Sequence, residues 1–204
     1  MQKQLQVMLQ LQDQMNTKVH PQWRQQQFAW FRALWVECGE LVDHYGYKWW
    51  KKQTPDAEQV ALELIDIWHF GLSIFIQSGK SFDDIISKIS SELNNAKPSD
   101  DFRADVEKFA LTTLSTKAFN VAEFSALMQG VNMTFESLYS GYVGKNVLNF
   151  FRQYNGYKDG SYRKIWNDGR EDNEHLVDVL AQMDTSSAEL KTLVYEALKT
   201  RYHA

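Results

Sequence analysis

Two pairs of carboxylates, each with a spacing of three residues, lie in the most apolar stretches of the chain. Residues 28–38 read FAWFRALWVEC and contain Glu37, with Glu40 three positions later; residues 60–76 read VALELIDIWHFGLSIFI and contain Glu63 and Asp66. Side chains at i and i+3 share one face of a helix. A carboxylate in an apolar helix suffers a large desolvation cost unless it is paired or bound to a metal. Four acids converging on one point favour a divalent cation, and all-oxygen ligands favour Mg²⁺, with Mn²⁺ as a substitute.

The chain between the two pairs allows them to meet. If the first helix ends near Gly46 and the next begins near Asp56, Glu40 lies roughly 9 Å and Glu63 roughly 10 Å from the respective helix ends. Two antiparallel helices would then hold both pairs at the same level. Salt bridges with lysines of the connecting segment are the alternative explanation for the buried acids.

The composition excludes several classes of protein. The chain has 204 residues, 44% of them hydrophobic and 24% charged, which is typical of a globular domain and not of a disordered chain. The single cysteine, Cys38, excludes an internal disulfide and a cysteine-based zinc site, and we expect it to be an inert buried thiol. No apolar run approaches the ~20 residues of a membrane span, and the glutamine-rich N-terminus does not resemble a signal peptide. We therefore expect a cytoplasmic protein.

Helical periodicity and capping residues follow one another along the chain, and the alternation typical of strands is missing. We expect Thr54 to cap one helix, with Pro55 in its first turn, and Ser81 and Ser99 to cap two others. The pattern predicts an all-α helical bundle of about eight to ten helices, folded as a single catalytic domain over residues 1–204. The expected helices cover residues 3–16, 23–45, 54–78, 81–93, 100–117, 120–130, 134–154, 172–183 and 186–202.

The charge of the chain is unevenly distributed. The net charge is −4, yet residues 145–170 hold six basic and only two acidic residues. Lys145, Asn149 and Arg152 are spaced to form one polar stripe on a helix, and more basic residues follow among glycines that permit close backbone approach to a ligand. This pattern favours a local anionic ligand over a surface for a polyanion; a solvated basic loop or a nucleic-acid patch is the alternative.

Four blocks of the sequence resemble a known enzyme family. The blocks E-C-G-E, Y-K-W-W-K and E-L-I-D-I-W-H-F, with YVGKNVLNFFRQYNGYKDGSYRKIWNDGREDN at Tyr142–Asn173, are similar to the dimeric all-α dUTPases of the all-α NTP pyrophosphatase superfamily. The resemblance covers residues 5–79 and 139–180, and residues 80–138 form a less well matched helical insertion. It implies a homodimer that converts dUTP to dUMP and pyrophosphate, and dUDP to dUMP and phosphate, without a nucleic-acid or membrane partner.

The resemblance also implies roles for individual residues. The four acids Glu37, Glu40, Glu63 and Asp66 match the catalytic Mg²⁺ ligands of the family. Metal-bound water would attack the substrate, and Glu37 is the preferred residue to position or deprotonate it.

Further positions match residues that bind the nucleotide. Gln12 and Asn16 match the pair that reads uracil, and their i, i+4 spacing puts both amides on one helix face. His69 and Phe70 match the lining of the nucleoside pocket, where Phe70 would stack on the base. Tyr47 replaces the tryptophan that the family commonly has. The remaining matches contact the phosphates or the nucleoside: Tyr47, Lys48, Lys145, Asn149, Arg152, Tyr157, Lys158 and Lys164.

Three other functions share parts of this pattern. A di-iron bundle needs two E-x-x-H motifs, and the nearest approach is Asp66-x-x-His69. A non-catalytic helical protein that binds nucleic acid would use the basic segment and would bind without metal. A pyrophosphatase of the same superfamily that acts on another nucleotide is the closer alternative.

Overall fold

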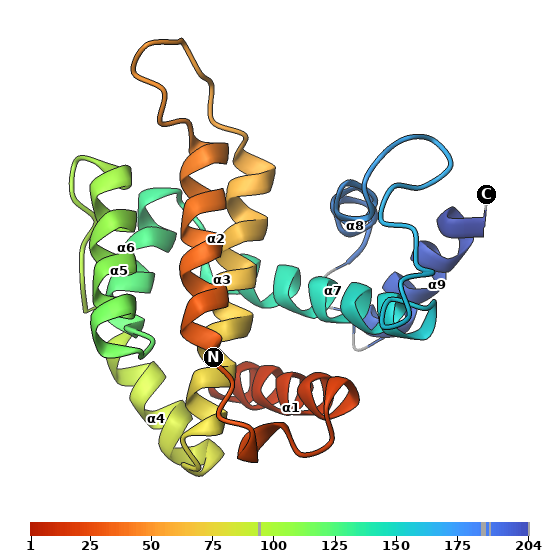
Figure 1. The fold of residues 1–204 in the computed structure, drawn as a ribbon, viewed down its shortest axis with the longest axis horizontal. Helices are drawn as coiled ribbons and strands as arrows, with labels where there is room; N and C mark the ends of the chain where they lie inside the picture. Colours follow the sequence, from red (N-terminus) through yellow and green to blue (C-terminus); the bar gives the residue numbers. More distant parts are fainter. Residues whose placement is uncertain (94, 185–186, 188, 204) are drawn as a thin grey trace. The chain divides into compact units, whose positions relative to one another are not determined.

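The prediction of an all-α protein is confirmed. The computed structural model describes residues 1–93, 95–184, 187 and 189–203, and over these residues the regular elements are nine α-helices and one 3-10 helix (Figure 1). Within the same residues, the one extended pairing recorded is an isolated bridge between Ile165 and Glu171.

The chain forms two compact units, Met1–Leu138 and Tyr139–Ala204, with the boundary inside one helix. The single catalytic domain expected from the sequence stays a prediction. The elements of the first unit are α1 (Gln2–Val19), η1 (Trp23–Gln25), α2 (Trp30–Tyr45), α3 (Ala57–Gln77), α4 (Phe82–Glu92), α5 (Phe102–Thr116) and α6 (Val121–Gly130). Helix α7 (Phe135–Tyr154) crosses the boundary, and α8 (Asp172–Ala181) and α9 (Leu190–His203) complete the second unit.

Helix α3 forms the core of the first unit. It lies antiparallel to α2 and also packs against α1 and α4 (Figure 1). Its residues Leu64, Ile67, Trp68 and Leu72 have no solvent exposure, and the Trp68 ring stacks on Phe124 of α6 at 5.2 Å. Because α3 is packed on several sides, its polar residues Glu63, His69 and Ser73 are buried and held in fixed positions.

By length and composition alone, α3 could span a membrane, which corrects the expectation that no apolar stretch approaches that length. Its titratable residues are too few to lower the mean hydropathy of the window below that of a span. However, 72% of the most apolar window is buried inside the protein, as in the central helix of a bundle.

Side-chain caps define several helix ends. Ser81 caps α4 as expected, because its hydroxyl accepts the Asp84 N–H at 3.1 Å. The expected cap at Thr54 is wrong: Asp56 caps α3 by accepting the Gln59 N–H, so Pro55 precedes the helix. Ser99 is likewise replaced by Asp101 as the cap of α5. In both cases a carboxylate closer to the helix takes the capping position.

The helix expected over residues 23–45 is interrupted. The 3-10 helix η1 ends at Gln25, and α2 begins only at Trp30. Gln27 has a φ of 52°, and this left-handed backbone cannot continue a right-handed helix. For the last expected helix, residues 185, 186 and 188 lie outside the described residues, and α9 begins at Leu190.

Candidate active site

The α2–α3 hairpin brings three carboxylates together. Oxygen atoms of Glu37, Glu63 and Asp66 all lie within 4.8 Å of one another, and Glu63 is only 6% exposed. Helix α2 ends at Tyr45 with Gly46 as its C-cap, and α3 begins at Ala57 after Asp56, which agrees with the register that the sequence predicts. Three of the four expected metal ligands therefore meet at one point.

Glu40 stands apart from this cluster. Its side chain is exposed, and it does not belong to the group of carboxylates that lie within 4.8 Å of one another. Its negative charge nevertheless acts on Glu37 one helical turn away and contributes to raising the pKa of that residue. Glu40 is thus close enough to add charge to the cluster without joining it.

The pKa of Glu37 is strongly perturbed. Burial is the largest cause, followed by the charge of Asp66, a hydrogen bond with Glu63 and the charges of Glu63 and Glu40, and together they raise the pKa to about 9. Without a cation, the cluster therefore relieves its repulsion by holding a proton. A divalent cation would relieve it in another way, and three converging carboxylates supply the oxygen ligands that hard cations prefer. The residues fit a Mg²⁺ or Mn²⁺ site.

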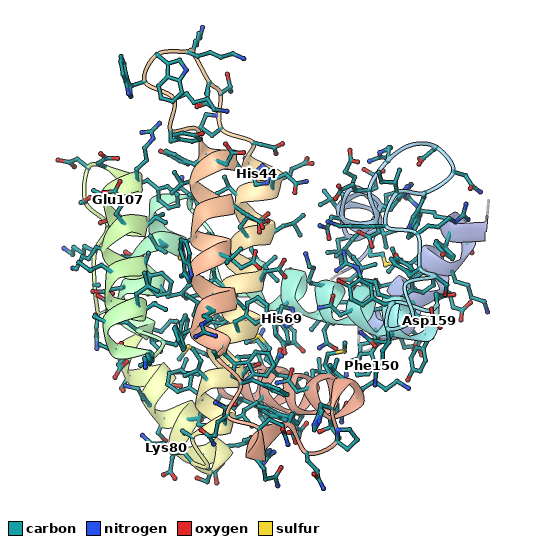
Figure 2. All side chains as sticks on the ribbon, viewed as in Figure 1. His44, His69, Lys80, Glu107, Phe150 and Asp159 are labelled. Carbon is teal, nitrogen blue, oxygen red and sulfur yellow. The ribbon has the colours of Figure 1, made fainter. Side chains whose placement is uncertain are left out.

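A histidine at the end of α2 also reaches the cluster, and sequence analysis missed it. His44 Nε2 lies 3.5 Å from Glu63 Oε1. His44 is seven residues after Glu37, so helical periodicity puts both on one face of α2, a signal present in the sequence. Figure 2 shows His44 at the end of the α2–α3 hairpin that carries the loop.

The lysines that could have neutralised the acids lie in the loop after α2. Lys48 pairs with Asp43 at 3.7 Å, and its ammonium group lies 5.2 Å from the ring centre of Tyr47. Lys51 and Lys52 are exposed. Tyr47, expected to contact substrate, is also exposed, so its ring is accessible from solvent.

A second polar group lies further along α3, where it faces α1. Gln12 Nε2 donates to Asn16 Oδ1 and to Ser73 Oγ, each at 3.0 Å, and Asn16 Nδ2 donates to Ser73 Oγ at 2.9 Å. His69 Nδ1 lies 2.7 Å from Gln12 Oε1, and the Ser73 hydroxyl donates to the His69 carbonyl oxygen at 3.0 Å. All four side chains are at least nine-tenths buried. The structure thus joins the expected base-reading amides to His69, and it adds Ser73.

Phe70 follows His69 on α3. Its ring is half-buried and stacks on Trp30 with centroids 6.1 Å apart and planes 28° apart. The Trp30 indole is fixed in turn, because Nε1 donates to Gln77 Oε1 at 2.9 Å. The Phe70 ring expected to stack on a base is therefore held in a defined plane.

The polar residues of the second unit are engaged with one another. Arg152 donates from Nε and Nη2 to the two carboxylate oxygens of Asp172, both at 2.8 Å. Asp172 has no exposed surface, and the Tyr162 hydroxyl donates to it at 2.8 Å. Arg152 therefore forms a buried ion pair that stabilises this unit, and its expected contact with phosphate stays a prediction.

The other expected phosphate contacts differ in exposure. Lys145 is buried and donates to Asn173 Oδ1 at 3.1 Å, and Asn149 Oδ1 accepts from Arg152 at 3.2 Å. Tyr157 and Lys158 are exposed, and Lys164 pairs with Glu171 at 3.4 Å on the surface.

A comparison with protein families decides the identity. A family model described as dUTPase matches residues 4–157, about three quarters of the chain. The chain belongs to the dUTPase family. A search of the curated proteins finds no match.

The dUTPase match covers both polar groups of the first unit. Its range runs from α1 through α7, so it contains the amide group, the carboxylate cluster and residues 80–138. Lys158 and Lys164 lie beyond it. As a dUTPase, the protein is a hydrolase that acts on dUTP, and its acidic cluster could bind the divalent metal that dUTPases generally use.

Proposed function

We propose that this dUTPase hydrolyses dUTP to dUMP and pyrophosphate, and dUDP to dUMP and phosphate, with Mg²⁺ as its cofactor. The observation that carries the proposal is the convergence of Glu37, Glu63 and Asp66 within 4.8 Å on two helices of the family match. Three acids this close together, one buried and two partly buried, repel one another unless a proton or a cation offsets their charge, and a cation is the one that a phosphate substrate needs.

The carboxylates and His44 would have different roles in binding and activating the phosphate groups of the substrate. Glu37, Glu63 and Asp66 would hold Mg²⁺, with Glu40 as a further ligand or outer charge. When bound, Mg²⁺ supplies charge neutralisation of the phosphates and lowers the pKa of a water molecule. Glu37 is the preferred residue to position or deprotonate the attacking water, since its carboxylate belongs to the cluster and is only partly buried. His44 would orient Glu63 from outside the cluster.

The amide group is proposed to bind the other end of the substrate. Asp66 and Ser73 are seven residues apart on α3, which corresponds to roughly 10 Å along the helix axis. A nucleotide lying along α3 would therefore place its phosphates near the carboxylates and its base near Gln12, Asn16 and His69. Phe70, fixed by Trp30, would stack on the base.

The remaining substrate contacts, the assembly and the location are also proposals. The family resemblance assigns charge stabilisation on the phosphates to basic residues, of which Lys158 and Lys164 are exposed. Arg152 would act mainly by holding its helix against Asp172. A homodimer in the cytoplasm, with neither nucleic acid nor a membrane as partner, follows from the family resemblance and the composition.

A hydrolysis panel tests the proposal. Purified enzyme is incubated with dUTP, dUDP, dTTP, dCTP and UTP, with Mg²⁺, with Mn²⁺ or with EDTA, and the products are separated by anion exchange. We expect pyrophosphate from dUTP and phosphate from dUDP, only when metal is present. Faster hydrolysis of another nucleotide would favour the alternative pyrophosphatase, and full activity in EDTA would contradict the metal site.

A further inference from the structure

Ser73 has a hydroxyl whose hydrogen-bonding capacity is completely used. A serine hydroxyl offers one donor and two acceptor lone pairs. In Ser73 the proton goes to the His69 carbonyl oxygen, and the two lone pairs accept from Gln12 Nε2 and Asn16 Nδ2. Because the side chain has no exposed surface, water cannot substitute for any of these partners.

These three hydrogen bonds of Ser73 determine which way each amide faces. With its proton given to the His69 carbonyl, Ser73 can only accept, so Gln12 and Asn16 must turn their NH₂ groups toward it. The Gln12 oxygen then faces His69 Nδ1 at 2.7 Å, which requires the proton of the neutral imidazole to be on Nδ1. One hydroxyl thereby sets two amide orientations and one tautomer.

Without Ser73, the hydrogen bonds that join Gln12 to Asn16 and to His69 can also form in the opposite direction. Gln12 could donate to Nδ1 of an imidazole protonated on Nε2, while its oxygen accepts from Asn16. The other hydrogen bonds of the group survive this reversal with donors and acceptors exchanged. Ser73 opposes it, because two amide oxygens would then face a hydroxyl that has no proton left for them.

The direction of these amides matters for the choice of base. Among the described residues, one N–H of Asn16 Nδ2 donates to Ser73, and one lone pair of Asn16 Oδ1 accepts from Gln12. The second N–H and the second lone pair can therefore bind a ligand. A carboxamide pairs with the O4/N3–H edge of uracil in one orientation and with the N4–H₂/N3 edge of cytosine in the other. An amide that is free to reverse therefore cannot discriminate between the two bases.

We propose that Ser73 is a specificity-determining positioning residue, which locks Gln12, Asn16 and His69 in the arrangement that accepts uracil and rejects cytosine. The proposal rests on the proposed function, since it assumes that these amides face the base. It assigns to Ser73 no contact with the reacting atoms. The expected consequence is an effect on KM and on base selectivity, with little effect on kcat.

The kinetic test compares Ser73→Ala with two companions. Ser73→Thr keeps the hydroxyl and can make the same bond to the carbonyl of residue 69. Ser78→Ala is the matched control, because the Ser78 hydroxyl also donates to a carbonyl of α3, that of Phe75, at 2.6 Å. For Ser73→Ala we expect KM for dUTP to rise about tenfold, kcat to change by less than about threefold, and the preference for dUTP over dCTP in kcat/KM to fall about tenfold. Ser73→Thr should recover most of the preference, and Ser78→Ala should match the wild type.

Two outcomes would overturn the proposal. One is Ser73→Ala with unchanged dUTP preference; the other is an equal loss of kcat for both nucleotides, as a merely structural role would produce. If the wild type itself does not prefer dUTP, the proposed function fails instead, and the two failures are thus distinguishable.

A second measurement needs no variant and no activity. Long-range ¹H–¹⁵N correlation of the metal-free wild type at pH 8 reports the tautomer of His69. We expect the Nδ1–H form; the Nε2–H form would show that Gln12 faces the other way and would overturn the orientation that the proposal requires. This readout can overturn the proposal even if Ser73→Ala does not fold.

Discussion

Glu37 of α2 and Glu63 of α3 share a hydrogen bond between their carboxyl groups. Two carboxyl groups can form such a bond only when one keeps a proton, because ionised carboxylates have only acceptors. Asp66 adds a further negative charge within 4.8 Å of both. The metal-free site is therefore a partly protonated cluster whose proton and whose expected cation compete for the same oxygen atoms.

This competition makes the stability of the metal-free protein depend on pH. In the unfolded chain Glu37 loses its proton near pH 4.5, whereas in the folded protein it keeps the proton up to about pH 9. Between these values the folded state binds more protons than the unfolded state, so the free energy of unfolding falls as pH rises, by at most about 1.4 kcal/mol per pH unit. Urea denaturation in EDTA at pH 6, 7 and 8 should show this decline.

The control for this prediction is Glu37→Gln, which cannot titrate. The difference between wild type and Glu37→Gln isolates the contribution of Glu37 from that of every other group. Added Mg²⁺ should stabilise the wild type more at pH 8 than at pH 6, because metal binding must displace the proton. Parallel pH dependences for the two proteins in EDTA would contradict the protonated cluster.

Removing one acid should separate stability from activity. We expect Glu37→Gln to raise the metal-free stability at pH 8, because glutamine, unlike Glu37, does not have to take up a proton on folding, and yet to lower kcat for dUTP by about 100-fold or more. Asp66→Asn should also abolish turnover without unfolding the protein. Glu107→Gln on the exposed face of α5 (Figure 2) is the matched control and should change neither property. Thermal melts and steady-state assays measure both, and near-normal activity in either site variant would refute the site assignment.

The parts of this site that sequence analysis predicted are those encoded by local helical spacing. Glu37 and Glu40, Glu63 and Asp66, and Gln12 and Asn16 each share a helix face by their separation alone, and hydrophobic periodicity located the helices. Glu40 shows the limit of such reasoning, since the same spacing leaves it exposed and outside the cluster. The break at Gln27 was missed because a single left-handed residue other than glycine has no sequence signature.

Contacts between distant segments were the parts that could not be predicted. Ser73 meets Gln12 and Asn16 across 61 and 57 residues of sequence. Its polar side chain in an apolar helix was a visible signal, but the partner depends on how α1 packs on α3. Arg152 was expected to face phosphate, because nothing in the local pattern reveals its pairing with Asp172.

The buried ion pair of the second unit should be essential for that unit. Asp172 is completely buried and holds Arg152 in a two-point contact, so Asp172→Ala leaves an uncompensated buried cation. We expect a loss of about 3–5 kcal/mol, visible as faster hydrogen exchange in α7 and α8. Asp178→Ala is the contrasting control: Asp178 pairs with Arg170 at 2.7 Å but is 39% exposed, and its loss should cost within about 1 kcal/mol. Equal effects of the two substitutions would contradict a structural role for the Arg152 pair.

Two helical glycines should respond to alanine in opposite directions. A Cβ atom at Gly71 of α3 would lie 2.8 Å from ring carbons of Phe119, whose ring is packed edge-on against Trp68 and Phe75 and cannot move away cheaply. Overpacking of this kind costs about 1–3 kcal/mol, more than alanine gains in helix propensity at an exposed site.

At Gly39 of α2, a Cβ atom would meet nothing within 4 Å. Gly39→Ala should therefore stabilise the protein by about 0.5–1 kcal/mol, because alanine loses less conformational entropy in a helix. Urea denaturation of both variants in EDTA at pH 7 measures the difference. Stabilisation by Gly71→Ala would mean that α3 and the segment around Phe119 are less tightly packed than described, which would also weaken the argument that α3 is rigid enough to hold the cluster and the amide group in place.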